Sequence, residues 1–259
     1  MSEALHAEWT KLRTLPGTGW LLLGVIAATV IISAAVSASV SCSSAATCHV
    51  DVTKLSLTGT YLGQAVVAIV AVLAVSGEYA TGMIRTTLAA MPRRTTVLAA
   101  KAAVVTAVTL AAGAPAVLGS VLAGRLILPG HGYTPANGYP VLSLANATVL
   151  RAAAGTVLYL ALIALLSLGI ATAVRDAAVA IGVVLGLLYL FPILAQVVGS
   201  PGVARHLQQI GPMTAGLEIQ ASTGLRGLPI GPWAGLGVLA AWAAAALLAG
   251  GLLLYLRDA

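Results

Sequence analysis

The chain has 259 residues, of which 59% are hydrophobic and only 8% are charged, and its formal net charge is +6. About a quarter of the residues of a soluble globular domain are charged, so this composition excludes a soluble protein and indicates an integral membrane protein. In a membrane protein, an excess of Lys and Arg indicates which loops face the cytoplasm. We therefore predict no nucleic-acid partner.

The first 19 residues are predicted to form an amphipathic helix on the membrane surface. Leu5, Trp9 and Leu12 recur at helical spacing, and charged or polar residues occupy the positions between them. Pro16 and the glycines after it end this segment. We therefore expect an interfacial helix within 1–19.

Six long apolar runs follow this segment. A helix of about 20 apolar residues crosses the hydrocarbon core because all its backbone hydrogen bonds are made internally. The predicted spans are 20–40, 57–75, 97–122, 152–174, 177–198 and 233–256. They predict an all-α integral membrane protein with one domain over 1–259, in which 20–256 form a six-span bundle.

The basic residues predict the orientation, since Lys and Arg concentrate on the cytoplasmic side of short loops. With the N-terminus inside, the inner set is larger than the outer set. The inner set is Lys11, Arg13, Arg85, Arg93, Arg94, Lys101, Arg175 and Arg257, and the outer set is Lys54, Arg125, Arg151, Arg205 and Arg226. We predict a multi-pass protein with both termini in the cytoplasm.

Both cysteines lie in the first loop that this orientation places outside. Disulfides persist outside the cytoplasm, so we predict a bond between Cys42 and Cys48. The alternative is a pair of free thiols, because spacing alone does not establish the geometry of a disulfide.

The segment "GEYATGMIRTTLAAMPRRTT" over 77–96 interrupts two uncharged apolar runs. Its apolar stripe, which includes Ile84, Leu88 and Met91, predicts that the second span continues inward as a helix until Pro92 ends it. One interpretation is a docking element for a cytoplasmic partner. The other is a loop whose arginines only fix the topology.

Three further features lie beyond this segment. The half-apolar segments 203–210 and 214–222 predict short helices at the outer interface, and Gly182 and Gly186 have the spacing of closely packed membrane helices. No Gly-x-x-x-x-Gly-Lys motif and no cluster of His or Cys ligands occurs in the sequence. We expect no catalytic site, no bound metal and no cofactor in this chain.

Three stretches together resemble the membrane subunits of bacterial type-2 ABC transporters, in the branch common in actinobacteria. They are "EWTKLRT", "GEYATGMIRTTLAAMPRRTTVLAAK" and "GPMTAGLEI". The family pattern of Glu, Gly, Arg, Leu, Pro and Arg after the second span is matched by Glu78, Gly82, Arg85, Leu88, Pro92 and Arg94.

The resemblance implies a permease subunit in the bacterial plasma membrane. It implies an N-terminal elbow helix, a cytoplasmic coupling helix between spans two and three, and short re-entrant helices before span six. It also implies a permease homodimer surrounded by membrane lipids, with a separate P-loop ATPase subunit that binds ATP and Mg. The residues expected to dock or couple to the ATPase are Glu78, Gly82, Ile84, Arg85, Leu88, Met91, Pro92 and Arg94.

The expected function is ATP-driven export of an amphiphilic or lipid-like small molecule. Spans two and five line the dimer cavity in the resembled family, so Tyr61, Gln64, Phe191 and Gln196 are the candidate pathway residues. Each Gln could instead bond a neighbouring helix. Two other functions stay open, a membrane-integrated lipid enzyme and a non-transporting anchor or immunity protein, although the sequence has no clustered acidic, His or Arg residues of the kind that a lipid enzyme needs.

Overall fold

The computed structural model describes residues 2–14, 16–42, 50–90 and 94–256, and these ranges contain helices, turns and loops but no strand. Six helices in them are long and apolar enough to cross a membrane. These helices are α2 (Pro16–Ser39), α4 (Thr60–Ala80), α6 (Arg94–Ile127), α7 (Ala147–Val174), α8 (Ala177–Val197) and α11 (Pro232–Leu256). The prediction of an all-helical, multi-pass membrane protein with six spans is confirmed.

Three of the spans begin several residues earlier than their apolar runs predict, and one of them is α2, which begins at Pro16. The 34-residue α6 begins at Arg94, and α7 begins at Ala147, where the Asn146 side chain accepts a hydrogen bond from the amide of Thr148. Such a side-chain cap satisfies one of the free amides at the start of a helix. A cap lies outside the apolar run, so hydropathy alone places the start of α7 too late.

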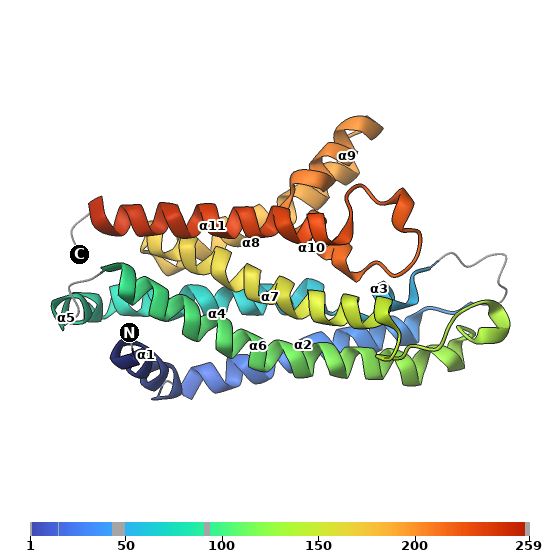
Figure 1. Ribbon diagram of the computed structural model, residues 1–259, viewed down its shortest axis with the longest axis horizontal. Coiled ribbons are helices and arrows are strands. Elements are labelled where there is room, and N and C mark those ends of the chain that lie inside the picture. The colour runs from blue at the N-terminus through green and yellow to red at the C-terminus, as the bar shows by residue number, and fades with distance from the viewer. Residues whose placement is uncertain (1, 15, 43–49, 91–93, 257–259) are drawn as a thin grey trace.

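Short helices lie at both ends of the bundle (Figure 1). The α1/α5 end carries α1 (Ser2–Thr14), α5 (Met83–Ala90) and the C-terminal end of α11. The opposite end, here called the Cys42 end, carries α3 (Val52–Ser56), η1 (Leu128–His131) and η2 (Pro135–Asn137). Before α11 come α9 (Pro201–Ile210), which points away from the bundle, then α10 (Pro212–Leu217), η3 (Glu218–Gln220) and η4 (Leu225–Gly227).

A break separates the second span from the helix that follows it. The α4 helix ends at Ala80, and Gly82 has a φ of 70°, in the left-handed region that glycine adopts without steric cost. The α5 helix starts at the next residue. The predicted continuation of span two as one helix to Pro92 is therefore wrong, since Gly82 ends one helix and allows another to begin.

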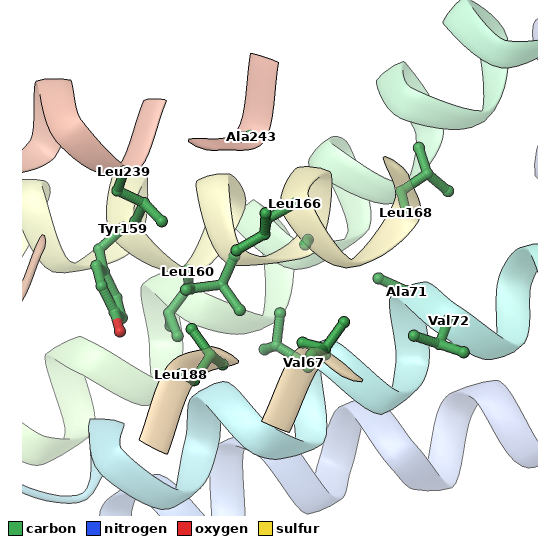
Figure 2. Packing of buried hydrophobic residues seen from close by; sticks show 14 of the residues in the cluster. Val67, Ala71, Val72, Tyr159, Leu160, Leu166, Leu168, Leu188, Leu239 and Ala243 are labelled. Atoms are coloured by element: carbon green, nitrogen blue, oxygen red, sulfur yellow. The ribbon is translucent and has the colours of Figure 1, made fainter. Parts of the chain in front are cut away.

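The centre of the bundle is α7, which packs against α4, α6, α8 and α11. Large side chains along it are fully buried, among them Tyr159, Leu160 and Leu166. Figure 2 shows Leu160 and Leu166 between Leu239 of α11 on one side and Val67 of α4 on the other. The remaining spans surround this helix and leave much of their outer surface exposed.

The α7 and α11 helices approach each other closely at two glycines. A Cβ atom on Gly169 would lie 2.5 Å from the carbonyl carbon of Ala246, and one on Gly250 would lie 2.5 Å from the carbonyl oxygen of Gly169. Glycine is required here because any side chain would force the helices apart. The predicted pair Gly182 and Gly186 instead has no described atom within 4 Å of an added Cβ.

Candidate functional site

Four charged side chains from three helices meet at the α1/α5 end. Glu8 and Lys11 come from α1, Glu78 from the last turn of α4, and Lys101 from the first part of α6. The Lys101 ammonium lies 2.7 Å from Glu8 and 2.6 Å from Glu78, and the Lys11 ammonium lies 2.9 Å from Glu8 and 2.8 Å from Glu78. In this charge cluster each lysine contacts both carboxylates, so every charged group has neighbours of the opposite sign.

Most of the charge cluster is closed to solvent. Lys101 is 4% exposed, Glu8 5% and Glu78 6%, whereas the Lys11 side chain keeps 25% of its surface. A single charge at this depth would be strongly unfavourable, and partners with good geometry offset that cost. Two positive and two negative groups also leave the cluster without net charge.

Lys11, like Glu8, lies on the short helix α1 and outside the six spans. Burial opposes its charged form, but hydrogen bonds to Glu78 and Glu8 and the Coulombic attraction of both carboxylates raise the pKa of Lys11 above its usual value. A raised pKa means that the folded protein favours the ammonium. Its stabilising contribution is therefore present at neutral pH and is lost only as the pH rises through the folded pKa.

The charge cluster also contacts α5. The Lys11 ammonium donates a hydrogen bond to the hydroxyl of Thr87 at 3.2 Å, and Thr87 donates to the carbonyl of Met83 at 3.0 Å. Ile84, one turn before Thr87, is 5% exposed. Among the described side chains of α5, Thr87 and Ile84 therefore mark its inner side.

A pocket of about 370 Å³ lies beside the cluster. All members of the charge cluster line it, together with Leu73, Ala74, Gly77, Thr81, Met83, Val104 and Val105. The Oε2 atom of Glu78 is buried and has no hydrogen-bond partner among the described residues. This pocket, here called the cluster pocket, has an apolar wall next to the four charged side chains.

The structure places the predicted coupling residues in several environments. Glu78 belongs to the charge cluster, Gly82 follows the end of α4, and Ile84 is buried on the inner side of α5. Arg94 donates hydrogen bonds to the carbonyls of Leu254 and Tyr255 at the end of α11. The side chains of Arg85 and Leu88, and the residues Met91 and Pro92, lie outside the described part of the chain.

Three members of the charge cluster were missed by the sequence reasoning. Glu8 was not selected, and Lys11 and Lys101 were interpreted only as markers of topology. The available signal was Glu8 and Lys11 at a spacing of three on an amphipathic helix, together with Lys101 two turns inside an apolar helix. A charge at that depth requires a partner, and Glu78 and Glu8 supply it.

The predicted pathway residues lie in two different settings. Gln64 is fully buried, donates to the carbonyl of Tyr61 at 3.3 Å and accepts a hydrogen bond from Tyr159 of α7. Gln196 is exposed on α8, and Phe191 makes an edge-to-face contact with Trp242.

A carboxylate organises the Cys42 end. Asp51 accepts hydrogen bonds from the amides of Thr53 and Lys54 at 3.0 and 3.1 Å, which caps α3. It also accepts from the hydroxyl and amide of Ser222 and from the amide of Thr223. Burial raises the pKa of Asp51, but the hydrogen bonds from Ser222, Thr223 and Lys54 outweigh it and lower the pKa below its usual value.

Two other contacts stabilise the Cys42 end. Cys42 is disulfide-bonded, and its amide donates to the carbonyl of His131 at 2.8 Å. Cys48 lies outside the described residues, so the pairing of Cys42 with Cys48 stays a prediction. Lys54 forms an ion pair with Glu218 at 3.2 Å.

The described residues contain no group of three His, Cys, Asp or Glu side chains that could hold a metal ion. No protein-family model and no curated protein matches the chain. The charge cluster and its pocket therefore carry the functional argument, together with the resemblance seen in the sequence.

Proposed function

We propose that this chain is the membrane-spanning permease subunit of an ATP-driven exporter. It works as a homodimer with a separate P-loop ATPase subunit and has no catalytic site of its own. The charge cluster carries the proposal, because it ties two short helices to the ends of two spans. Its side-chain contacts connect α1, α4, α5 and α6 into one contiguous network, the kind of structure that can carry coupling between sites.

The α5 helix has the form expected of a docking element. It is only 8 residues long, too short to cross a membrane, and its exposed positions include Met83, Thr86 and Ala89. Its inner side contacts the protein through Ile84 and Thr87. In the proposed arrangement α5 is the coupling helix on the cytoplasmic side, and its outer face contacts the ATPase.

Movement of α5 would reach the spans through the charge cluster. Thr87 contacts Lys11, Lys11 contacts Glu78 at the end of α4, and Glu78 contacts Lys101 in α6. Closure of the ATPase on ATP would displace α5 and so re-tilt α4 and α6 together. In this proposal α1 is the elbow helix, and α9 and α10 are the short helices at the outer face that precede the last span.

The proposal is tested by a matched pair of substitutions, one on α5 and one at the Cys42 end. Thr87→Val removes the hydroxyl that Lys11 contacts and keeps the shape of the side chain. Thr58→Val makes the same change at the Cys42 end, where the hydroxyl donates to the carbonyl of Leu55 at 2.9 Å. A hydrogen bond to a charged group contributes about 1.5–3 kcal/mol, so Thr87→Val should lower transport per ATP hydrolysed roughly tenfold while Thr58→Val changes it little.

The measurement uses the chain purified with the ATPase from its native membrane and reconstituted into liposomes. ATP turnover and movement of a fluorescent single-chain lipid are recorded for each variant. The absence of ATP hydrolysis from the purified complex would overturn the proposed function. Equal transport per ATP in Thr87→Val and Thr58→Val, with the ATPase bound in both, would overturn the coupling route.

A further inference from the structure

We infer that a groove between α1, α2 and α6 binds one acyl chain of a membrane phospholipid. The head group would lie at the α1/α5 end, beside Trp9 and Trp20, and the chain would extend between α2 and α6. This groove, here called the Trp9 groove, shares no lining residue with the cluster pocket. The inference does not depend on an ATPase or on transport.

The size and lining of the Trp9 groove suit a hydrocarbon chain. Its volume is about 620 Å³, which falls within the range of sites that hold small molecules. Leu22, Leu23 and Ile26 of α2 contribute to the lining, and so do Ala107 and Ala111 of α6. The described residues that line the groove include no charged side chain, so a chain without polar groups can lie against them.

Short side chains leave the α6 side of the groove hollow. Ala107 and Ala111 are one helical turn apart and both are exposed. Val108 and Ala112, the next residues along, also line the groove but are only 8% and 5% exposed. The two buried residues therefore form the floor, and a larger side chain at Ala111 would extend into the open part.

Hydrocarbon is the medium that surrounds the Trp9 groove, because two of its three helices, α2 and α6, are membrane spans. Apolar cavities stay dry, and an unfilled void loses the dispersion contacts of its lining. Lipid tails are as apolar as leucine side chains, so no hydrophobic gain separates a bound chain from the bulk lipid. Contact with three helices instead of one holds the bound chain more strongly.

Two tryptophans place the head group at the α1/α5 end of the groove. Trp9 of α1 and Trp20 near the start of α2 line the groove and are 49% and 76% exposed. Tryptophan is enriched at the level of the lipid head groups. Ile26 lies six residues after Trp20, which is about 9 Å along a helix, so a chain whose head is beside Trp20 passes Ile26 within the membrane.

The position of α1 favours a lipid chain over a helix from a second copy of the protein. Figure 1 shows α1 next to the start of α2, and α1 contacts both α2 and α6. Trp9 therefore bounds the groove at the α1/α5 end. A partner helix must cross the full hydrocarbon thickness of about 30 Å and would have to continue past α1, whereas a lipid chain ends there at its head group.

The experiment uses the full chain in phosphatidylcholine nanodiscs that contain a small fraction of phosphatidylcholine with a photoreactive group halfway along one acyl chain. Labelled peptides are located by mass spectrometry. Segments 22–26 and 107–112 should be labelled about tenfold more than the exposed segment of α11 that contains Ala241, a difference that corresponds to about 1.4 kcal/mol. Equal labelling would overturn the inference, and so would weaker labelling of 22–26, the result expected if a second copy covered the groove.

Two variants provide the matched control. Ala111→Phe places a large side chain in the groove and should lower labelling of 22–26 about tenfold. Ala241→Phe makes the same change at an alanine that is also exposed, on α11, and should leave labelling of 22–26 unchanged. An equal effect of the two variants would overturn the inference. The labelling pattern of the wild-type protein decides the question even where a variant does not fold.

Discussion

The two ends of the bundle hold their carboxylates in different ways. At the Cys42 end Asp51 takes its hydrogen bonds mainly from backbone amides and from the hydroxyl of Ser222. At the α1/α5 end Glu8 and Glu78 rely on the flexible side chains of Lys11 and Lys101. Backbone donors are fixed by the fold, whereas lysine side chains can follow a helix that moves.

This difference separates an end held by backbone donors from an end held by side chains. At the Cys42 end, which also contains disulfide-bonded Cys42, Asp51 joins α3 to the segment after η3. The charge cluster instead joins α1, α4, α5 and α6 through side chains and keeps one carboxylate oxygen of Glu78 unused. The comparison predicts that substitutions at the two ends differ in both size and kind of effect.

The largest expected effect is that of Lys101→Met. This change leaves two buried carboxylates with only Lys11 as a partner, and loss of one partner from a buried ion pair costs about 3–5 kcal/mol. Thermal unfolding in detergent, followed by tryptophan fluorescence, measures the loss.

Lys54→Met is the matched control at the Cys42 end. Lys54 and Glu218 also form an ion pair, but their side chains keep 34% and 14% of their surface. A pair of this kind contributes about 0–1 kcal/mol, so the unfolding temperature should fall much less than in Lys101→Met. Equal losses in the two variants would show that the charge cluster has no special structural role.

The sequence predicts the spans much better than it predicts the charge cluster. An apolar run of sufficient length is a local property, so the six spans follow from composition and length. The ion pairs of Glu78 and Lys101 with α1 join residues 67 and 93 positions apart, and no local pattern encodes that contact. Lys11 and Lys101 were therefore interpreted only as markers of topology. Gly82 was identified only through the family pattern, and the structure adds the reason for a glycine there, which is its left-handed φ.

The next effect in size is that of Asp51→Asn, and it should depend on pH. The folded pKa of Asp51 is lowered, so its contribution is present above the unfolded pKa of about 3.9 and is lost as the pH falls through the folded value. Asn supplies one acceptor oxygen in place of two. At neutral pH the variant should lose about 1.5–3 kcal/mol, and amide exchange around Ser222 should become faster.

The difference between Asp51→Asn and the parent should shrink as the pH falls from the unfolded pKa of about 3.9 through the lower folded pKa, because a protonated Asp51 resembles the amide. Hydrogen exchange at pH 7 and over a series of acidic pH values that continues below the folded pKa measures this, with α1 as the internal control. A difference that stays constant over this range would contradict the assignment of the lowered pKa to the hydrogen bonds from Ser222 and Thr223.

The smallest expected effect lies between the two ends, at Tyr159→Phe. Tyr159 is fully buried and donates its hydroxyl proton to Gln64. A hydrogen bond between membrane helices contributes about 0.6 kcal/mol on average, so the unfolding temperature should fall slightly. Tyr189→Phe is the control, because Tyr189 is only half-buried and donates to the carbonyl of Tyr61, and it should change stability less.

The same pair of variants tests the predicted pathway role of Gln64. If Gln64 serves only to join α4 to α7, Tyr159→Phe should lower stability without changing which lipid the reconstituted complex moves. If Gln64 contacts cargo, release of its amide from Tyr159 should change cargo selectivity, and the effect should exceed that of Tyr189→Phe. Gln64 is fully buried and already hydrogen-bonded to Tyr61 and Tyr159, so we expect the first outcome. The polar groups with a functional role would then be those of the charge cluster at the α1/α5 end.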